Sequence, residues 1–170
     1  DADPLNFIPK DSQTNISYNY LLDNLTGAAT IEIQIDTPEG WLNDQYWKPI
    51  TQLQATLAQS PHTTRAMSPY DFLKKINQWD QDLDPEHYKL PDNTQHAQQL
   101  LDLLEPEDKT ELDRLATSDG QHIRVSAILN TMNSNNVQTV VTLAQQAIQR
   151  LPEPLTAHTT GISIRLENMQ

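Results

Sequence analysis

The 170-residue chain holds 11 basic and 23 acidic residues, which give it a net charge of −12. This charge disfavours nucleic acids and anionic lipid headgroups as partners, because both bind clustered positive charge. The chain contains no cysteine, which excludes disulfide bonds, thiol catalysis and cysteine-ligated metals. No apolar run approaches the roughly 18 residues of a membrane span, and the opening DADPLNF lacks the basic and apolar regions of a signal peptide. We therefore expect a mature or excised soluble piece, long enough for one domain with a real core.

Residues 1–28 form the first segment of the chain. Their composition predicts a linker followed by a short helix that ends at a glycine. The pattern then changes, because Ile31, Ile33 and Ile35 alternate with polar residues. Three β-branched residues at a period of two predict a half-buried strand over residues 29–36.

A helix is predicted to begin near Asn43. Its apolar stripe recurs at the spacing of one helix face and consists of Tyr46, Ile50, Leu53 and Leu57. Pro49 falls inside this stretch, and its ring cannot be accommodated in a regular helix interior. We therefore expect the first turn of this helix to be loose or kinked.

The remaining elements alternate between strands, helices and one polar loop. In chain order they are a strand over 62–68, a helix opening at Pro69, a loop over 80–94, two short helices on either side of Pro106, a strand over 121–131, a helix over 135–151 and a last strand from His158. The residues expected to face the core are Ile123, Val125, Ala127 and Leu129 in the third strand, and Val137, Val140, Val141, Ala144, Ile148 and Leu151 in the last helix.

The order of these elements predicts the fold class. Without residues 69–120, the chain reads strand, helix, strand, strand, helix, strand. This is the order of an α+β, ferredoxin-like split β-α-β-β-α-β unit with antiparallel strands and both helices on one face. We expect residues 29–170 to form this unit, with a helical insertion at about 69–120 between its second and third strands.

Three carboxylates, Asp36, Glu39 and Asp44, lie within nine positions at the predicted turn from strand to helix. Catalytic carboxylate pairs need a cleft and a raised pKa on one partner, and an exposed turn supplies neither. Asp44 would instead stabilise the helix, because a negative charge in the first turn interacts favourably with the positive end of the helix dipole. A structural role in the turn and helix cap is therefore the better interpretation.

Metal sites are not indicated by any motif. Asp80, Asp82 and Asp84 resemble the start of an EF-hand loop, but Pro85 stands where that loop needs glycine and Pro91 where it needs a bidentate glutamate. The five histidines show no zinc-binding spacing; they are His62, His87, His96, His122 and His158. The four glycines form no phosphate-binding loop, and no nucleophile motif is present. We expect no enzyme, no cofactor and no metal.

Four aromatic residues cluster at the start of the predicted insertion: Tyr70, Phe72, Trp79 and Tyr88. They are the candidate substrate contacts, because aromatic side chains commonly line apolar ligand grooves. Such residues more often pin an insertion onto the core of a domain, and both interpretations remain open on the sequence alone.

Several segments in order resemble the extracytoplasmic loop of RND-superfamily exporters, in the MMPL-like, predicted-exporter branch. The similar segments are FIPKDS at 7–12, LTG at 25–27, EIQID at 32–36, LNDQYWKPITQLQATL at 42–57, MSPYDFLKKIN at 67–77, YKLPDNTQHAQQLLDLLE at 88–105 and TGISIRLENM at 160–169. Together they cover nearly the whole chain in the order found in that family.

The resemblance implies a function as well as a fold. It implies a loop on the periplasmic face of the bacterial inner membrane, in an exporter driven by proton flow. It also implies that ferredoxin-like subdomains move against a sister loop and the transmembrane helices of the same parent chain, and so pass hydrophobic or lipid-like cargo. The proton-relay carboxylates of that family sit in transmembrane helices, so no residue here carries that role. The alternative is a free-standing acidic extracytoplasmic module that binds a ligand or protein.

Overall fold

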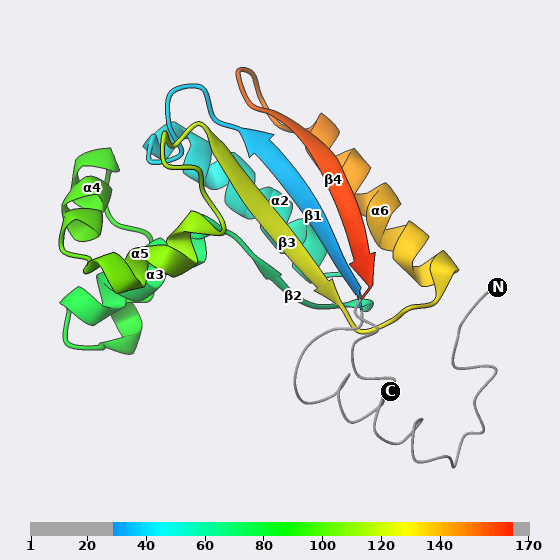
Figure 1. Ribbon diagram of the computed structural model, residues 1–170, viewed down its shortest axis with the longest axis horizontal. Coiled ribbons are helices and arrows are strands. Elements are labelled where there is room, and N and C mark those ends of the chain that lie inside the picture. The colour runs from blue at the N-terminus through cyan, green and yellow to red at the C-terminus, as the bar shows by residue number, and fades with distance from the viewer. Residues whose placement is uncertain (1–28, 165–170) are drawn as a thin grey trace, which may run out of the picture.

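The computed structural model describes residues 29–164 (Figure 1). The predicted linker and short helix of residues 1–28 lie outside the described residues. The described elements are β1 (Ala29–Asp36), η2 (Asp44–Tyr46), α2 (Trp47–Ala58), β2 (Thr63–Met67), α3 (Pro69–Asp80), η3 (Pro85–His87), α4 (Thr94–Asp102), α5 (Pro106–Asp113), β3 (His122–Leu129), α6 (Ser134–Gln149) and β4 (Thr156–Ile164). The α+β class predicted from the sequence is confirmed.

The strands form one four-stranded antiparallel sheet in the order β2-β3-β1-β4. β1 is central and pairs along its whole length with both β3 and β4. Its first residue, Ala29, lies opposite Leu129 on one side and Ile164 on the other. The described segment therefore enters and leaves the sheet at the same end.

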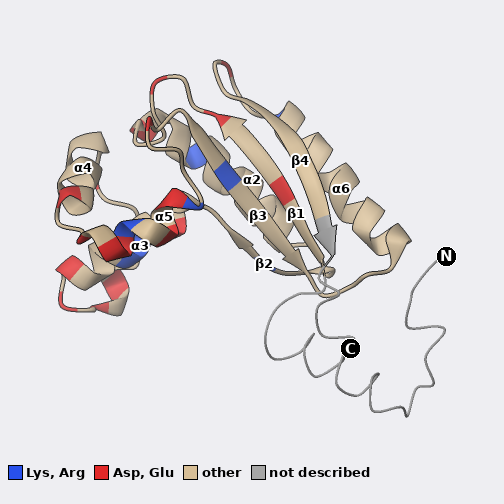
Figure 2. Ribbon diagram, in the orientation of Figure 1, with Lys and Arg blue, Asp and Glu red and all other residues tan. Residues whose placement is uncertain are grey.

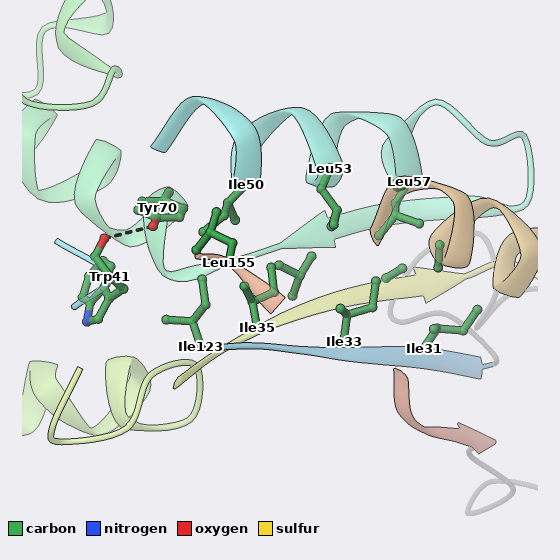
Figure 3. Close-up of a cluster of buried hydrophobic side chains, with 14 of the residues drawn as sticks. Ile31, Ile33, Ile35, Trp41, Ile50, Leu53, Leu57, Tyr70, Ile123 and Leu155 are labelled. Atoms are coloured by element: carbon green, nitrogen blue, oxygen red, sulfur yellow. Dashed lines mark hydrogen bonds between the residues drawn. The ribbon is translucent and has the colours of Figure 1, made fainter. Parts of the chain in front are cut away.

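Helices α2 and α6 pack on one face of the sheet (Figure 1). Ile31, Ile33 and Ile35 of β1 are fully buried and point toward α2 (Figure 3). The predicted core residues of the last helix are buried too, except for partly buried Ile148 and Leu151. Each fully buried isoleucine contributes about 1.5–3 kcal/mol relative to an exposed one.

The two predicted apolar stripes that face this layer are confirmed. Tyr46, Ile50, Leu53 and Leu57 are all buried, as are Ile123, Val125, Ala127 and Leu129. Before α2 the chain forms the short 3-10 turn η2, and Pro49 is the third residue of α2. The first turn of an α-helix does not use its N–H groups within the helix, so proline is accommodated there. The expected irregular first turn is thus a 3-10 segment.

The segment between β2 and β3 contains α3, α4 and α5, which lie beside the sheet unit rather than on it (Figure 1). We call residues 69–120 the insertion. It has a small core of its own, in which the buried side chains are Ile76, Leu100 and Leu104. The predicted loop over 80–94 holds the short turn η3, and Pro106 opens α5 rather than separating the two helices.

The first turn of α3 joins the insertion to the sheet unit. Ser68 and Asp71 form a capping box at the start of α3, and Pro69 occupies its first position. Tyr70 follows and is fully buried in the main core. Its hydroxyl donates a 2.9 Å hydrogen bond to the carbonyl of Trp41, and the two rings meet edge to face at 5.7 Å between centroids (Figure 3). Tyr70 therefore pins the insertion to the core.

Candidate ligand groove on the insertion

An open groove of about 430 Å³ lies on the insertion between α3 and α5. This volume lies within the range of small-molecule sites. Its apolar lining consists of Phe72, Ile76, Trp79, Leu83 and Leu104, and its polar lining of Lys75, Gln78, Glu107, Asp108 and Glu111. The groove therefore combines an apolar interior with a mostly acidic edge.

The floor of the groove is the small core of the insertion. Ile76 and Leu104 are only 5% and 8% exposed, and Phe72 packs against them as a partly buried residue. The walls are different, because Trp79 and Leu83 are 59% and 63% exposed. Large apolar side chains left in water beside a buried apolar floor mark a surface that can gain stability by binding an apolar group.

The helical repeat of α3 explains why its apolar residues share the groove. Phe72, Ile76 and Trp79 are spaced by four and then three residues, so they lie on one face of the helix. Leu83 reaches the groove because the chain reverses after α3. Its backbone and that of Asp82 have positive φ angles of 63° and 54°, and the Leu83 N–H donates to the carbonyl of Gln78 at 2.9 Å.

The edge of the groove carries three carboxylates from α5 and one amine from α3. Glu107, Asp108 and Glu111 are exposed, and none of them forms a hydrogen bond or ion pair through its carboxylate with another residue in the described range. Lys75 is the single cation of the lining. Acidic residues are also dense elsewhere on the insertion (Figure 2). The insertion as a whole has 13 acidic and five basic residues, so it carries −8 of the net charge of −12.

The structure separates the four predicted aromatic contacts. Phe72 and Trp79 line the groove together. Tyr70 is fully buried under the first turn of α3, where desolvation raises the pKa of its phenol, and no ligand reaches it there. Tyr88 is 50% exposed but does not line this groove. Tyr70 therefore pins the insertion to the core, which was one interpretation made from the sequence. Phe72 and Trp79 line a groove, which was the other.

The groove also contains residues to which the sequence pattern did not point, namely Leu83, Leu104 and the three α5 carboxylates. Leu104 and Leu83 belong to segments that were predicted as a helix and a loop without a binding role. The i, i+3 spacing of Asp108 and Glu111 was a visible signal, because it places them on one face of α5. Their place in the same lining as Trp79 depends on tertiary packing.

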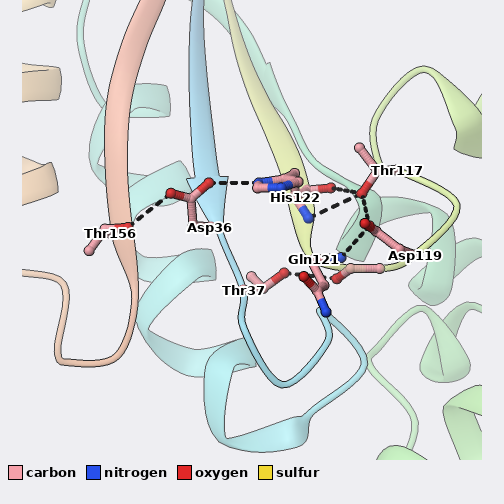
Figure 4. A network of polar contacts seen from close by, with 8 residues as sticks. Asp36, Thr37, Thr117, Asp119, Gln121, His122 and Thr156 are labelled. Atoms are coloured by element: carbon pink, nitrogen blue, oxygen red, sulfur yellow. Dashed lines mark hydrogen bonds and ion pairs between the residues drawn. The ribbon is translucent and has the colours of Figure 1, made fainter.

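The carboxylate at the end of β1 belongs to a polar cluster on the sheet, away from the groove (Figure 4). One oxygen of Asp36 lies 2.7 Å from His122 Nδ1, and Thr156 donates to the other oxygen at 3.1 Å. The hydrogen bond from His122 holds the pKa of Asp36 below its ordinary value. A lowered pKa keeps this carboxyl ionised, which is opposite to what a general acid needs.

The other two carboxylates of the turn make local structural contacts. Glu39 accepts a 2.7 Å hydrogen bond from the side chain of Asn43, which caps η2. The Asp44 N–H donates to the Thr94 hydroxyl at 2.9 Å, and the Thr94 N–H donates back to the Asp44 carboxylate at 3.2 Å. These contacts tie the start of α4 to η2. Asp36, Glu39 and Asp44 therefore serve three separate contacts and do not converge.

The aspartates and histidines that could bind calcium or zinc do not converge on a common site in the described residues. Asp84 caps η3 by accepting from the Glu86 N–H at 3.0 Å and lies 3.2 Å from His87 Nδ1. Within residues 29–164 no group of three or more histidine, aspartate or glutamate side chains is placed to hold a metal ion. Across that same range no helix has both the length and the apolar character needed to cross a bilayer.

Comparisons with known proteins add no identification. No family model matches the chain, and no curated protein matches it in sequence.

Proposed function

We propose that this chain is an extracytoplasmic loop of a proton-driven RND exporter. In this role it contributes to the passage of hydrophobic or lipid-like cargo by conformational change. The proposal joins the sequence resemblance to the MMPL-like branch with two features of the structure, its topology and its groove.

The topology supports a ferredoxin-like subdomain. The sheet order β2-β3-β1-β4 is antiparallel throughout, with α2 connecting β1 to β2 and α6 connecting β3 to β4. Two interlocked β-α-β units of this kind make the split β-α-β-β-α-β arrangement. The insertion leaves this unit between its second and third strands, as the proposal requires.

The observation that carries the proposal is the pairing of Ala29 with Ile164. A loop that leaves a membrane and returns to it has its entry and exit close together. The described segment meets this requirement, because β1 begins and β4 ends side by side at one end of the sheet (Figure 1). The insertion lies away from that end, where it is free to contact cargo or a sister loop.

Fractionation of native cells tests the proposal. An antibody raised against residues 1–170 is used to blot inner-membrane, periplasmic and cytoplasmic fractions, and antibody preabsorbed with the purified chain serves as the control. The expected result is an inner-membrane band several times larger than the 19.3 kDa of this chain. A water-soluble band near 19.3 kDa would contradict the exporter and favour the free-standing acidic binding module.

A further inference from the structure

We propose that the groove between α3 and α5 binds a cationic amphiphile, with its apolar chain on Phe72, Ile76 and Leu104 and its positive head beside the carboxylates of α5. As a statement about exported cargo, this inference rests on the proposed function. As a statement about binding, it is tested on the chain alone.

The shape and exposure of the groove suit an apolar chain. The groove has a volume of about 430 Å³. Its floor is the small core of the insertion, whose apolar side chains are already buried from water. Trp79 and Leu83 stand on its sides with more than half of each side chain in water. A single alkyl chain laid between them would remove this apolar surface from solvent, which is the main favourable term in such binding.

The charge of the groove selects the head group. The lining contains three carboxylates without partners in the described part of the chain and one amine, so the edge is anionic. The surrounding insertion, at −8, strengthens the attraction for a cation and repels an anion at short range. A fatty acid or an anionic lipid would bring a negative charge to this negative edge and be repelled. A neutral lipid would form no ion pair with the carboxylates.

Trp79 adds a second interaction with a cation. Its indole is 59% exposed, lines the groove, and makes no hydrogen bond with the described residues. Tryptophan is the best aromatic partner for ammonium groups, especially quaternary ones, through the negative face of its ring. A head group between Trp79 and α5 would meet the ring and the carboxylates together.

The tryptophan content of the chain provides a direct readout. The other two tryptophans, Trp41 and Trp47, are only 5% and 6% exposed. A soluble quencher therefore acts mainly on Trp79. We would titrate the chain with dodecyltrimethylammonium below its micelle concentration and follow emission and acrylamide quenching. Dodecyl sulfate and dodecyl maltoside carry the same alkyl chain with an anionic and a neutral head, and serve as matched ligands.

The expected result is saturable binding of one dodecyltrimethylammonium per chain, with Trp79 shielded from acrylamide. Its affinity should exceed that of dodecyl sulfate on the order of tenfold at low salt, because several exposed charge pairs act together. The preference should weaken as salt is added, since exposed charges are screened. Equal affinity for the two charged ligands, or binding that leaves Trp79 accessible, would overturn the proposal.

Variants locate the site. Glu107→Gln/Asp108→Asn/Glu111→Gln should abolish the preference for the cation but retain dodecyl maltoside binding. Glu107 and Asp108 also stabilise α5, because they place negative charge in its first turn. Glu111→Gln alone therefore provides a second variant that leaves this first turn unchanged. The control is Glu86→Gln/Asp92→Asn/Glu153→Gln, which removes three exposed charges outside the groove. If the control lowers the preference as much as the groove variant does, net charge alone is responsible and the proposed site is wrong.

Failure of this test is distinguishable from failure of the proposed function. Membrane fractionation reports the parent protein and does not depend on any ligand. Titration reports the groove and does not depend on a membrane.

Discussion

The sheet unit and the insertion differ in how they bury apolar surface. In the sheet unit, β1 presents three fully buried isoleucines to helices on one face, within one large continuous core. The insertion has three helices over a small core of its own, and α5 buries none of its residues. A few other residues of the insertion, among them Leu73 and Ala97, join the large core. The insertion also carries two thirds of the net charge of the chain. A rigid scaffold thus holds a smaller, more acidic and more exposed part.

The comparison indicates where each part gets its stability. Large continuous cores unfold cooperatively, whereas segments with few buried contacts open locally at lower free energy. Tyr70, Leu73 and Ala97 connect the two parts through the large core, and the hydrogen bonds between Asp44 and Thr94 add a polar contact. We therefore expect the insertion to open before the sheet does. The first two changes below test this expectation, and the other two each probe one residue, Leu83 in the insertion and Asp36 in the sheet.

The largest effect is expected from Ile33→Ala in the sheet. Ile33 is fully buried at the centre of β1, and truncation of such a residue costs about 2–5 kcal/mol through lost burial and the cavity left behind. The matched variant Ile76→Ala sits at 5% exposure in the small core of the insertion. Chemical denaturation should show a clearly smaller loss for Ile76→Ala, and equal losses would mean that the two parts unfold as one.

Tyr70→Phe tests the connection between the two parts. The change removes the hydroxyl that donates to the carbonyl of Trp41 and leaves that buried carbonyl without this donor. The expected cost is about 1–2 kcal/mol. Hydrogen exchange should accelerate in the insertion before it does in β1. Tyr88→Phe, at a half-exposed tyrosine, is the control and should change neither.

Leu83→Asn should separate stability from binding. Leu83 has a φ angle of 63°, which asparagine tolerates better than leucine. The free energy of unfolding should therefore rise by up to about 1 kcal/mol, while affinity for every dodecyl ligand falls because one wall of the groove is lost.

Leu103→Asn is the matched control for this change. Leu103 is 61% exposed like Leu83, has an ordinary φ angle of −78°, and does not line the groove. Asparagine at this position should leave both stability and affinity nearly unchanged. A gain in stability at Leu103 as large as at Leu83 would refute the backbone explanation.

The smallest effect is expected from Asp36→Asn on the sheet. The hydrogen bond from His122 lowers the pKa of the folded-state carboxyl, so its contribution to stability is present at neutral pH and is lost as pH falls through that lowered value. The difference in stability between the two proteins should be largest near neutral pH, at less than about 1 kcal/mol. It should shrink below about pH 4. Denaturation curves measured at several pH values check this.

Secondary structure and buried faces were predicted correctly from the sequence where they depend on a local residue pattern. Alternation predicted β1, and helical spacing predicted the buried stripes of α2 and α6, because one apolar face repeats with the geometry of its own element. The irregular helix start is the 3-10 segment η2, which precedes Pro49, and Pro49 itself lies in the first turn of α2. The turn at the end of α3 was less visible, because Asp82 and Leu83 adopt left-handed backbone without the glycine that normally signals it.

The groove was predicted only in part, since it depends on how α3 and α5 pack. Phe72 and Trp79 were chosen from the aromatic cluster, and both line the groove. Tyr70 could not be told apart from them, because its burial results from contact with Trp41, 29 positions earlier in the chain. Leu104 reaches the site through tertiary contacts that no local spacing reveals. The spacing of Asp108 and Glu111 indicates a shared helix face but not which residues that face packs beside.

The pairing of Ala29 with Ile164 also determines how the domain responds to mechanical tension. A pull applied at these two neighbouring positions acts across the antiparallel ladder of β1 and β4, whose hydrogen bonds lie perpendicular to the strands. Such a load opens the ladder one rung at a time, like a zipper, instead of shearing all rungs together. The sheet is therefore expected to yield at low force when stretched through these positions, while a force applied through the tip of the insertion would first meet the buried contact of Tyr70.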